Sequence, residues 1–267
     1  MAYETYRLLK IETSAGIITA TIDNPPINII TMELFGELAR LSAELEADPD
    51  PLVFVLKSAN PDFFIAHFDV NAILSFPTDQ APSREAAAKN EYHAMCERFR
   101  TMDKVTIAQI EGRVGGGGSE LSMAFDMRFG VKGKTIVNQM EVPIGILPGG
   151  GGTQRLPRLV GQGRAMFLNL TGDFIDAETA YAWGLVERVV SAAELEDAAV
   201  AIADRIASRS PHAVAVLREL ARTTRDLPLE EGLRREADGF VRCLRSADGA
   251  EGVAAFIEKR PPVFSGR

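Results

Sequence analysis

Four consecutive glycines lie directly before a helical pattern in EGRVGGGGSELSMAFD, residues 111–126. Glycine in that number costs conformational entropy and gives up side-chain packing, so something needs bare backbone there. Amides at a helix N-terminus point outward and carry the positive end of the helix dipole, which stabilises a ligand oxygen that becomes negative. The segment therefore predicts an oxyanion-binding loop, followed by a helix that begins near Ser119 and carries Glu120. A second glycine run, PGGGGTQRL at 148–156, follows Glu141.

The common glycine motifs do not fit these runs. Counted from Gly115, the sixth position is Glu120, where a dinucleotide fingerprint needs glycine. GVKGKT at 130–135 has two residues between its glycines, whereas a phosphate-binding P-loop needs four. Ser119 lies in GGSEL instead of a Gly-x-Ser-x-Gly elbow, and none of the three histidines is near it in sequence. These spacings argue against nucleotide binding by either motif and against a serine hydrolase.

Composition narrows the classes of ligand. The 267-residue chain has a formal net charge of -8 and no run rich in Lys or Arg, so nucleic acid and anionic membranes are poor partners. Cys96 and Cys243 fit neither a disulfide framework nor a metal site, and we expect no metal. The N-terminus does not read as a secretory signal, and no apolar run is long enough to span a bilayer. We expect a soluble, cytoplasmic protein.

The elements before the glycine loop follow from periodicity. Alternation on both sides of Gly16 predicts a hairpin over 8–26, and the apolar run 52–58 predicts a strand buried on both faces. Between them, Thr31 is a plausible N-cap for a helix. The apolar residues of that helix at helical spacing are Leu34, Leu38, Leu41 and Leu45. Strand, helix and strand in this order indicate an α/β layered fold.

The remaining chain predicts a helix over 83–102 and strands over 105–112 and 185–190, and it is nearly all helical from Ala192. The change to a nearly all-helical pattern at Ala192 divides the chain into two parts. Residues 1–191 form a core with the site, and residues 192–267 form a helical region whose apolar surface suits oligomerisation. The two apolar stripes of that region are Leu195, Ala199, Ile202 and Ile206, then Val214, Leu217, Leu220 and Ala221.

Four ordered segments resemble the enoyl-CoA hydratase/isomerase family, also called the crotonase superfamily. The segments are IEGRVGGGGSELSMAFD, MEVPIGILPGGGGTQRLPRLVG, LTGDFIDAETAYAWGLVERVV and EGVAAFIEKRPPVFSGR. The resemblance runs nearly the whole chain. It implies a crotonase-like α/β spiral of β-β-α repeats, followed by a helical C-terminal region that packs subunits into a homotrimer or a dimer of trimers.

The resemblance also implies an acyl-CoA thioester substrate, with coenzyme A as part of that substrate and no separate cofactor. Family members hold the thioester oxygen of an enolate with two backbone amides, which match Phe68 and Gly117 here. A glycine exposes its amide and lets the thioester approach the backbone. The implied substrate-binding positions are Ala66, Phe68, Asp69, Val70, Gly117, Pro143, Gly149, Phe256 and Lys259.

Phe256 and Lys259 match family positions that reach across the trimer toward the nucleotide part of CoA. Taken alone, Lys259 and Arg260 could simply compensate the end of the last helix before Pro261. In an acidic protein that binds a polyanionic ligand, a local lysine is physically sensible.

For hydration the family uses two glutamates, whose positions Glu120 and Glu141 fill. Water must lose a proton as its oxygen attacks the β-carbon, and the α-carbon must gain one. Two carboxylates around one water resist joint ionisation, which biases one toward acid and the other toward base. The sequence leaves open which glutamate is which.

Two positions depart from the family pattern. His67 stands where glycine is usual, and it is either a packing residue or a new acid/base group. Glu111 replaces a common asparagine without a functional interpretation.

The leading hypothesis is reversible hydration of a 2-enoyl-CoA. The alternatives are double-bond isomerisation or another thioester-enolate reaction, and a non-catalytic or RNA-binding relative. A dehalogenase-like member would want a carboxylate between Pro143 and Pro157, where the chain has none. Pocket walls in the family come largely from the region matching 70–100, whose sequence here gives no acyl-chain length.

Overall fold

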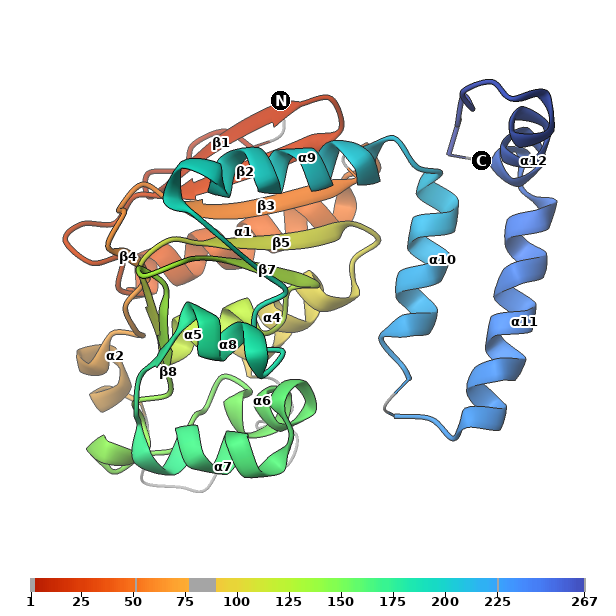
Figure 1. Ribbon diagram of the computed structural model, residues 1–267. Helices are drawn as coiled ribbons and strands as arrows, with labels where there is room; N and C mark the ends of the chain where they lie inside the picture. Colours follow the sequence, from red (N-terminus) through yellow and green to blue (C-terminus); the bar gives the residue numbers. More distant parts are fainter. Residues whose placement is uncertain (1–2, 51, 77–89, 225, 267) are drawn as a thin grey trace.

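The N-terminal alternation forms the predicted hairpin, which is the edge of a six-stranded sheet (Figure 1). The computed structural model describes residues 3–50, 52–76, 90–224 and 226–266. The sheet order is β1-β2-β3-β5-β7-β10; β1 pairs antiparallel with β2 and the other neighbours pair in parallel. Its strands are β1 (Leu9–Ser14), β2 (Ile17–Ile22), β3 (Val53–Ser58), β5 (Val105–Ile110), β7 (Met127–Val131) and β10 (Arg188–Val190).

A second, four-stranded sheet has the order β4-β6-β8-β9. Its strands are β4 (Phe63–Ile65), β6 (Arg113–Gly115), β8 (Ile136–Asn138) and β9 (Ile175–Asp176). Consecutive strands alternate between the sheets, because β3, β5 and β7 belong to the first and β4, β6 and β8 to the second. A helix follows each of these pairs, so the expected β-β-α repeat is present.

The helices are α1 (Met32–Ala47), α2 (Val70–Leu74), α4 (Glu91–Thr101), α5 (Gly117–Ser122), α6 (Gly152–Val160), α7 (Gln162–Thr171), α8 (Ala177–Ala182), α9 (Leu195–Ala207), α10 (Pro211–Ala221), α11 (Leu229–Arg245) and α12 (Ala247–Glu258). Two short 3-10 helices are η1 (Val142–Ile144) and η2 (Ala192–Glu194). None of the described helices is long and apolar enough to cross a membrane.

Helix α1 confirms its sequence pattern, since the Thr31 side chain accepts a hydrogen bond from the Leu34 amide and the four predicted leucines are fully buried. Helix α4 begins at Glu91 behind the cap Asn90, and the predicted start at residue 83 lies outside the described residues. Helix α5 begins at Gly117, two residues before the predicted start at Ser119.

Helix α9 covers one face of the first sheet, where Leu195, Ala199 and Ala203 pack against the apolar strand residues. Helices α10 to α12 instead lie beside the sheets as a separate group, with α11 next to α10 (Figure 1). In this chain, large apolar side chains of that group are exposed, including Leu217, Leu233, Phe240, Leu244, Phe256 and Ile257. The division at residue 191 stays a prediction, and the group that stands apart begins at α10.

The buried face of α1 gives a test of core packing. Leu38→Ala should lower the free energy of unfolding by about 2–5 kcal/mol, because it removes buried methyl groups and leaves a cavity. Glu46→Ala, on the exposed face of the same helix, removes only a surface pair with Arg98 and should cost less than about 1 kcal/mol. Denaturant unfolding measures both changes, and equal losses would contradict this assignment of faces.

Candidate active site

The first glycine run links β6 to α5 by a turn that suits only glycine. Gly116 has φ 48° and ψ −127°, a conformation that side-chain-bearing residues rarely adopt. A Cβ on Gly118 would lie 2.6 Å from the Cβ of Ile65 in β4, so the loop must pack directly against that strand. After this turn the chain enters α5, a short, buried helix that carries Gly117 and Glu120.

The backbone of Phe68 lies beside Gly117. Ile30 fixes this segment, because its amide donates to the His67 carbonyl at 2.9 Å and its carbonyl accepts from Asp69 at 3.0 Å. A Cβ on Gly117 would be 3.6 Å from the Phe68 nitrogen. Among the described residues, neither the Phe68 nor the Gly117 amide donates a hydrogen bond. These two amides are therefore candidate donors to a ligand oxygen, as an oxyanion hole requires.

The second glycine run holds Glu120. Oε1 of this carboxylate accepts hydrogen bonds from the Gly150 amide at 2.8 Å and the Gly152 amide at 2.7 Å. A Cβ on Gly150 would lie 2.6 Å from Oε2 of Glu120, so the approach requires a bare backbone. Burial raises the pKa of Glu120, whereas the loop amides and the charge of Arg155 oppose that rise.

Glu141 has a different environment. It precedes the short helix η1 and is almost completely buried, and within the described structure its Oε2 has no hydrogen-bond partner. Burial, together with the charge of Glu120, raises the pKa of Glu141 to about 7. The two carboxyl groups thus differ in how well the protein stabilises their ionised forms.

A pocket of about 580 Å³ is lined by both glutamates and by both residues that carry the candidate amides. Its lining residues are Met32, Phe35, Phe68, Ile73, Phe76, Asn90, Glu91, Tyr92, Gly117, Glu120, Glu141, Ile146, Leu147, Gly149 and Gly150. Sequence reasoning missed Met32, Phe35 and Tyr92, which lie in helices remote from the glycine runs. Their apolar or aromatic character is also that of core residues, so the sequence carries no distinguishing signal for them.

The other predicted positions are not among the lining residues. Ala66 is buried just before the Phe68 segment, Asp69 caps α2, and Val70 begins that helix. Pro143 lies in η1, where a Cβ on Gly172 would touch its ring.

Phe256 and Lys259 lie at the end of α12, and this helix stands apart from α2 and α5, which carry residues that line the pocket (Figure 1). Lys259 is the αL C-cap of that helix, and both side chains are exposed. Neither residue lines the described pocket.

The two departures from the expected pattern have structural partners. His67 Nδ1 lies 2.7 Å from the Phe68 carbonyl oxygen, so its ring is hydrogen-bonded to the backbone that carries the candidate amide. This contact favours a structural role for His67 over an acid/base role. Glu111 forms an ion pair with Lys134 at 2.7 Å.

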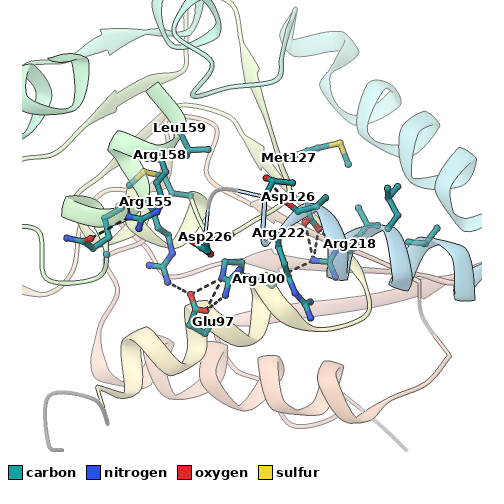
Figure 2. Close-up of a pocket in the computed structure, with 18 of the residues that line it drawn as sticks. Glu97, Arg100, Asp126, Met127, Arg155, Arg158, Leu159, Arg218, Arg222 and Asp226 are labelled. Atoms are coloured by element: carbon teal, nitrogen blue, oxygen red, sulfur yellow. Dashed lines mark hydrogen bonds and ion pairs between the residues drawn. The ribbon is translucent and has the colours of Figure 1, made fainter. Parts of the chain in front are cut away.

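A larger hollow of about 1000 Å³ separates α10 from the body of the fold, and it contains none of the predicted site residues (Figure 2). Six arginines line it, and three of them pair with carboxylates: Arg100 and Arg155 with Glu97, and Arg218 with Asp126 at 2.8 Å. Arg155 connects this hollow to the site, since it bonds Glu97 at 2.8 Å and donates to the Gly150 carbonyl at 2.8 Å. No group of three or more potential metal ligands occurs among the described residues.

Comparison with known proteins places this site in a family. The model of the family described as "Enoyl-CoA hydratase/isomerase" matches residues 12–267. The carnitinyl-CoA dehydratase of Proteus mirabilis (strain HI4320) is 34% identical over 263 residues, which is 97% of this chain and 98% of that protein.

Two solved structures share the fold. An enoyl-CoA hydratase of Geobacillus kaustophilus HTA426 has a TM-score of 0.91 at 31% identity, with both chains fully covered. One from Bacillus anthracis has a TM-score of 0.89 at 31% identity, covering 98% of this chain and all of that one. These matches confirm the crotonase-like fold that the sequence predicts. The chain belongs to the enoyl-CoA hydratase/isomerase family.

Proposed function

We propose that the protein is an enoyl-CoA hydratase that adds water reversibly to a 2-enoyl-CoA thioester. The observation that supports this most directly is the presence of two buried carboxyl groups, Glu120 and Glu141, in one pocket with two free backbone amides. Hydration needs a base, an acid and a site for developing negative charge, and the pocket contains a candidate for each. Coenzyme A belongs to the substrate in this proposal, and the reaction needs no separate cofactor.

The thioester carbonyl oxygen would accept hydrogen bonds from Phe68 and Gly117. As water attacks the β-carbon, negative charge moves through the α-carbon to this oxygen and forms an enolate. Donors fixed in advance stabilise that charge without reorganising, which lowers the barrier. The apolar lining, which includes Phe35 and Phe68, would keep bulk water away from the enolate.

The unequal environments of the two glutamates support a division of the two proton transfers between them. Glu120, whose oxygen receives two amide hydrogen bonds, is the better carboxylate and would take a proton from the attacking water. Glu141, with an unpaired oxygen and a pKa of about 7, would hold a proton and give it to the α-carbon. The product is the 3-hydroxyacyl-CoA, and the same groups exchange roles when water is eliminated.

The similar proteins support a reaction of this type. A carnitinyl-CoA dehydratase, by its name, removes water from an acyl-CoA, which is the reverse direction of the proposed chemistry. The acyl group that this chain uses needs its own test, because a sequence identity of about a third allows different residues in the pocket wall. A panel of 2-enoyl-CoA thioesters with short, long, branched, aromatic and carnitine-derived acyl groups would identify it.

Replacing either glutamate tests the proposed chemistry. Glu120→Gln and Glu141→Gln should each lower hydratase activity by about a hundredfold to ten-thousandfold, because each removes a positioned acid/base group. Binding of CoA thioesters should survive, since the Phe68 and Gly117 amides are unchanged. Loss of the conjugated thioester absorbance measures turnover, and Glu111→Gln, which removes a carboxylate outside the pocket, is the matched control.

The same variants separate hydration from isomerisation. Isomerisation moves one proton between two carbons, which a single carboxylate can do. If the wild-type protein hydrates no member of the panel but shifts the double bond of a 3-enoyl-CoA, and only one glutamate matters, the isomerase alternative replaces the hydratase.

The raised pKa of Glu141 predicts a pH-dependent stability. Between its ordinary value of 4.5 and about 7, the folded protein holds this proton more tightly than the unfolded chain does. Rising pH therefore favours unfolding across this window. The stability that protonated Glu141 contributes at low pH is lost as pH passes about 7. The free energy of unfolding of Glu141→Gln, minus that of wild type, should increase over the same window. A difference that stays constant with pH would contradict a raised pKa.

We also propose that the chain assembles into a trimer or a dimer of trimers, in which Phe256 and Lys259 reach the pocket of a neighbour. The exposed apolar side chains of α10 to α12 support association. Sedimentation should show the oligomer. Lys259→Ala should weaken CoA-thioester binding by at most about 1.5–3 kcal/mol, the worth of a charge-assisted hydrogen bond.

Lys132→Ala is the control, because it removes an equal charge from another exposed position. An active monomer would contradict both the assembly and the role of Lys259. An unchanged dissociation constant for Lys259→Ala at low salt would leave that residue as a helix cap alone.

A further inference from the structure

Tyr92, the second residue of α4, contacts both glycine loops at once. Its hydroxyl donates a hydrogen bond to the Gly117 carbonyl oxygen at 2.6 Å. A Cβ on Gly150 would lie 2.7 Å from Cε1 of Tyr92, so the edge of the ring packs directly on the second loop. One side chain therefore spans the gap between the candidate oxyanion hole and the loop that holds Glu120.

The ring of Tyr92 also packs against the other half of the amide pair. Its centroid lies 5.9 Å from that of Phe68, with the two planes at 79°. A second contact, with Phe35 at 5.8 Å, holds the ring from the side of α1. Such aromatic contacts restrict the orientation of the phenol and thus the direction of its hydroxyl.

The hydroxyl of Tyr92 acts as a donor in this position. Burial raises its pKa well above the ordinary value, so it remains protonated at neutral pH. A phenol has one proton, and the bond to the Gly117 carbonyl uses it. Tyr92 therefore holds the protein backbone, and its only hydroxyl proton is not available for exchange with a substrate.

Gly117 needs such a restraint because it has no side chain and follows Gly116, another residue with wide conformational freedom. Fixing its carbonyl restricts rotation of the backbone at the residue whose amide faces the pocket. We propose that Tyr92 is a positioning residue, which orients the Gly117 amide toward the ligand oxygen and sets the spacing between that amide and Glu120. The inference deepens the proposed function, because it takes the Phe68 and Gly117 amides as the thioester-binding pair.

Tyr92→Phe tests the proposal, since it keeps the ring and removes only the hydroxyl. A conjugated dienoyl-CoA is the probe, because hydrogen bonds to its thioester oxygen polarise the chromophore and move its absorbance to longer wavelength. The variant should bind this thioester with a smaller red shift than wild type. Turnover on a hydratable enoyl-CoA should fall about two- to tenfold in kcat, the effect of one neutral hydrogen bond, with KM little changed.

Tyr6→Phe is the matched control, because it removes a tyrosine hydroxyl that bonds Glu44 at 2.9 Å outside the pocket. It should keep the wild-type red shift and kcat. A wild-type shift and kcat in Tyr92→Phe, or equal losses in both variants, would overturn the positioning role.

The red shift also separates this proposal from the hydratase assignment. If wild-type protein shifts the bound probe but hydrates no thioester, the hydratase proposal fails, and the comparison of variants still decides the role of Tyr92. If bound probe shows no shift in wild type, the amide pair and the role of Tyr92 are both wrong.

Discussion

The site depends on the two hydrogen bonds that Gly150 and Gly152 donate to one oxygen of Glu120. They join α5 to a glycine run 30 or more residues further along the chain, and they oppose the rise in pKa that burial causes in Glu120. One oxygen of Glu141 has no hydrogen-bond partner in the described structure, and burial, together with the charge of Glu120, raises the pKa of this group to about 7. In the proposed hydration, this difference between the two environments would let one carboxyl act as base and the other as acid.

The path of the backbone through the two sheets brings the residues of the site together. Each β-β-α repeat carries the chain from one sheet to the other, and the turns after β4 and β6 bring Phe68 beside Gly117. Glycine is required at the closest approaches, because a side chain on Gly118 would collide with Ile65. On the outer side, Arg155 holds the Gly150 carbonyl while its charge also opposes protonation of Glu120. The second loop is thus restrained from both sides.

Local patterns predicted the elements well. Thr31 caps α1, and the alternation around Gly16 forms a hairpin, since both depend on neighbours in sequence. The resemblance to a family gave Glu120, Glu141, Phe68 and Gly117, which the structure places in one pocket. Tyr92 could not be predicted, because its role arises from contacts with Gly117 and Gly150, residues 25 and 58 positions away, and its ring resembles any core aromatic in the sequence. The proposed contact of Phe256 and Lys259 with ligand involves a second chain, so the structure of one chain does not test it.

The two glutamates should differ in protonation before substrate binds. Neutron diffraction from deuterated crystals of the unliganded protein tests this directly, because deuterium on a carboxyl oxygen is visible. At about one pH unit below the pKa of Glu141, we expect deuterium on Glu141 and none on Glu120. Deuterium on Glu120 with a bare Glu141, or equal occupancy on both, would rule out the proposed division of acid and base.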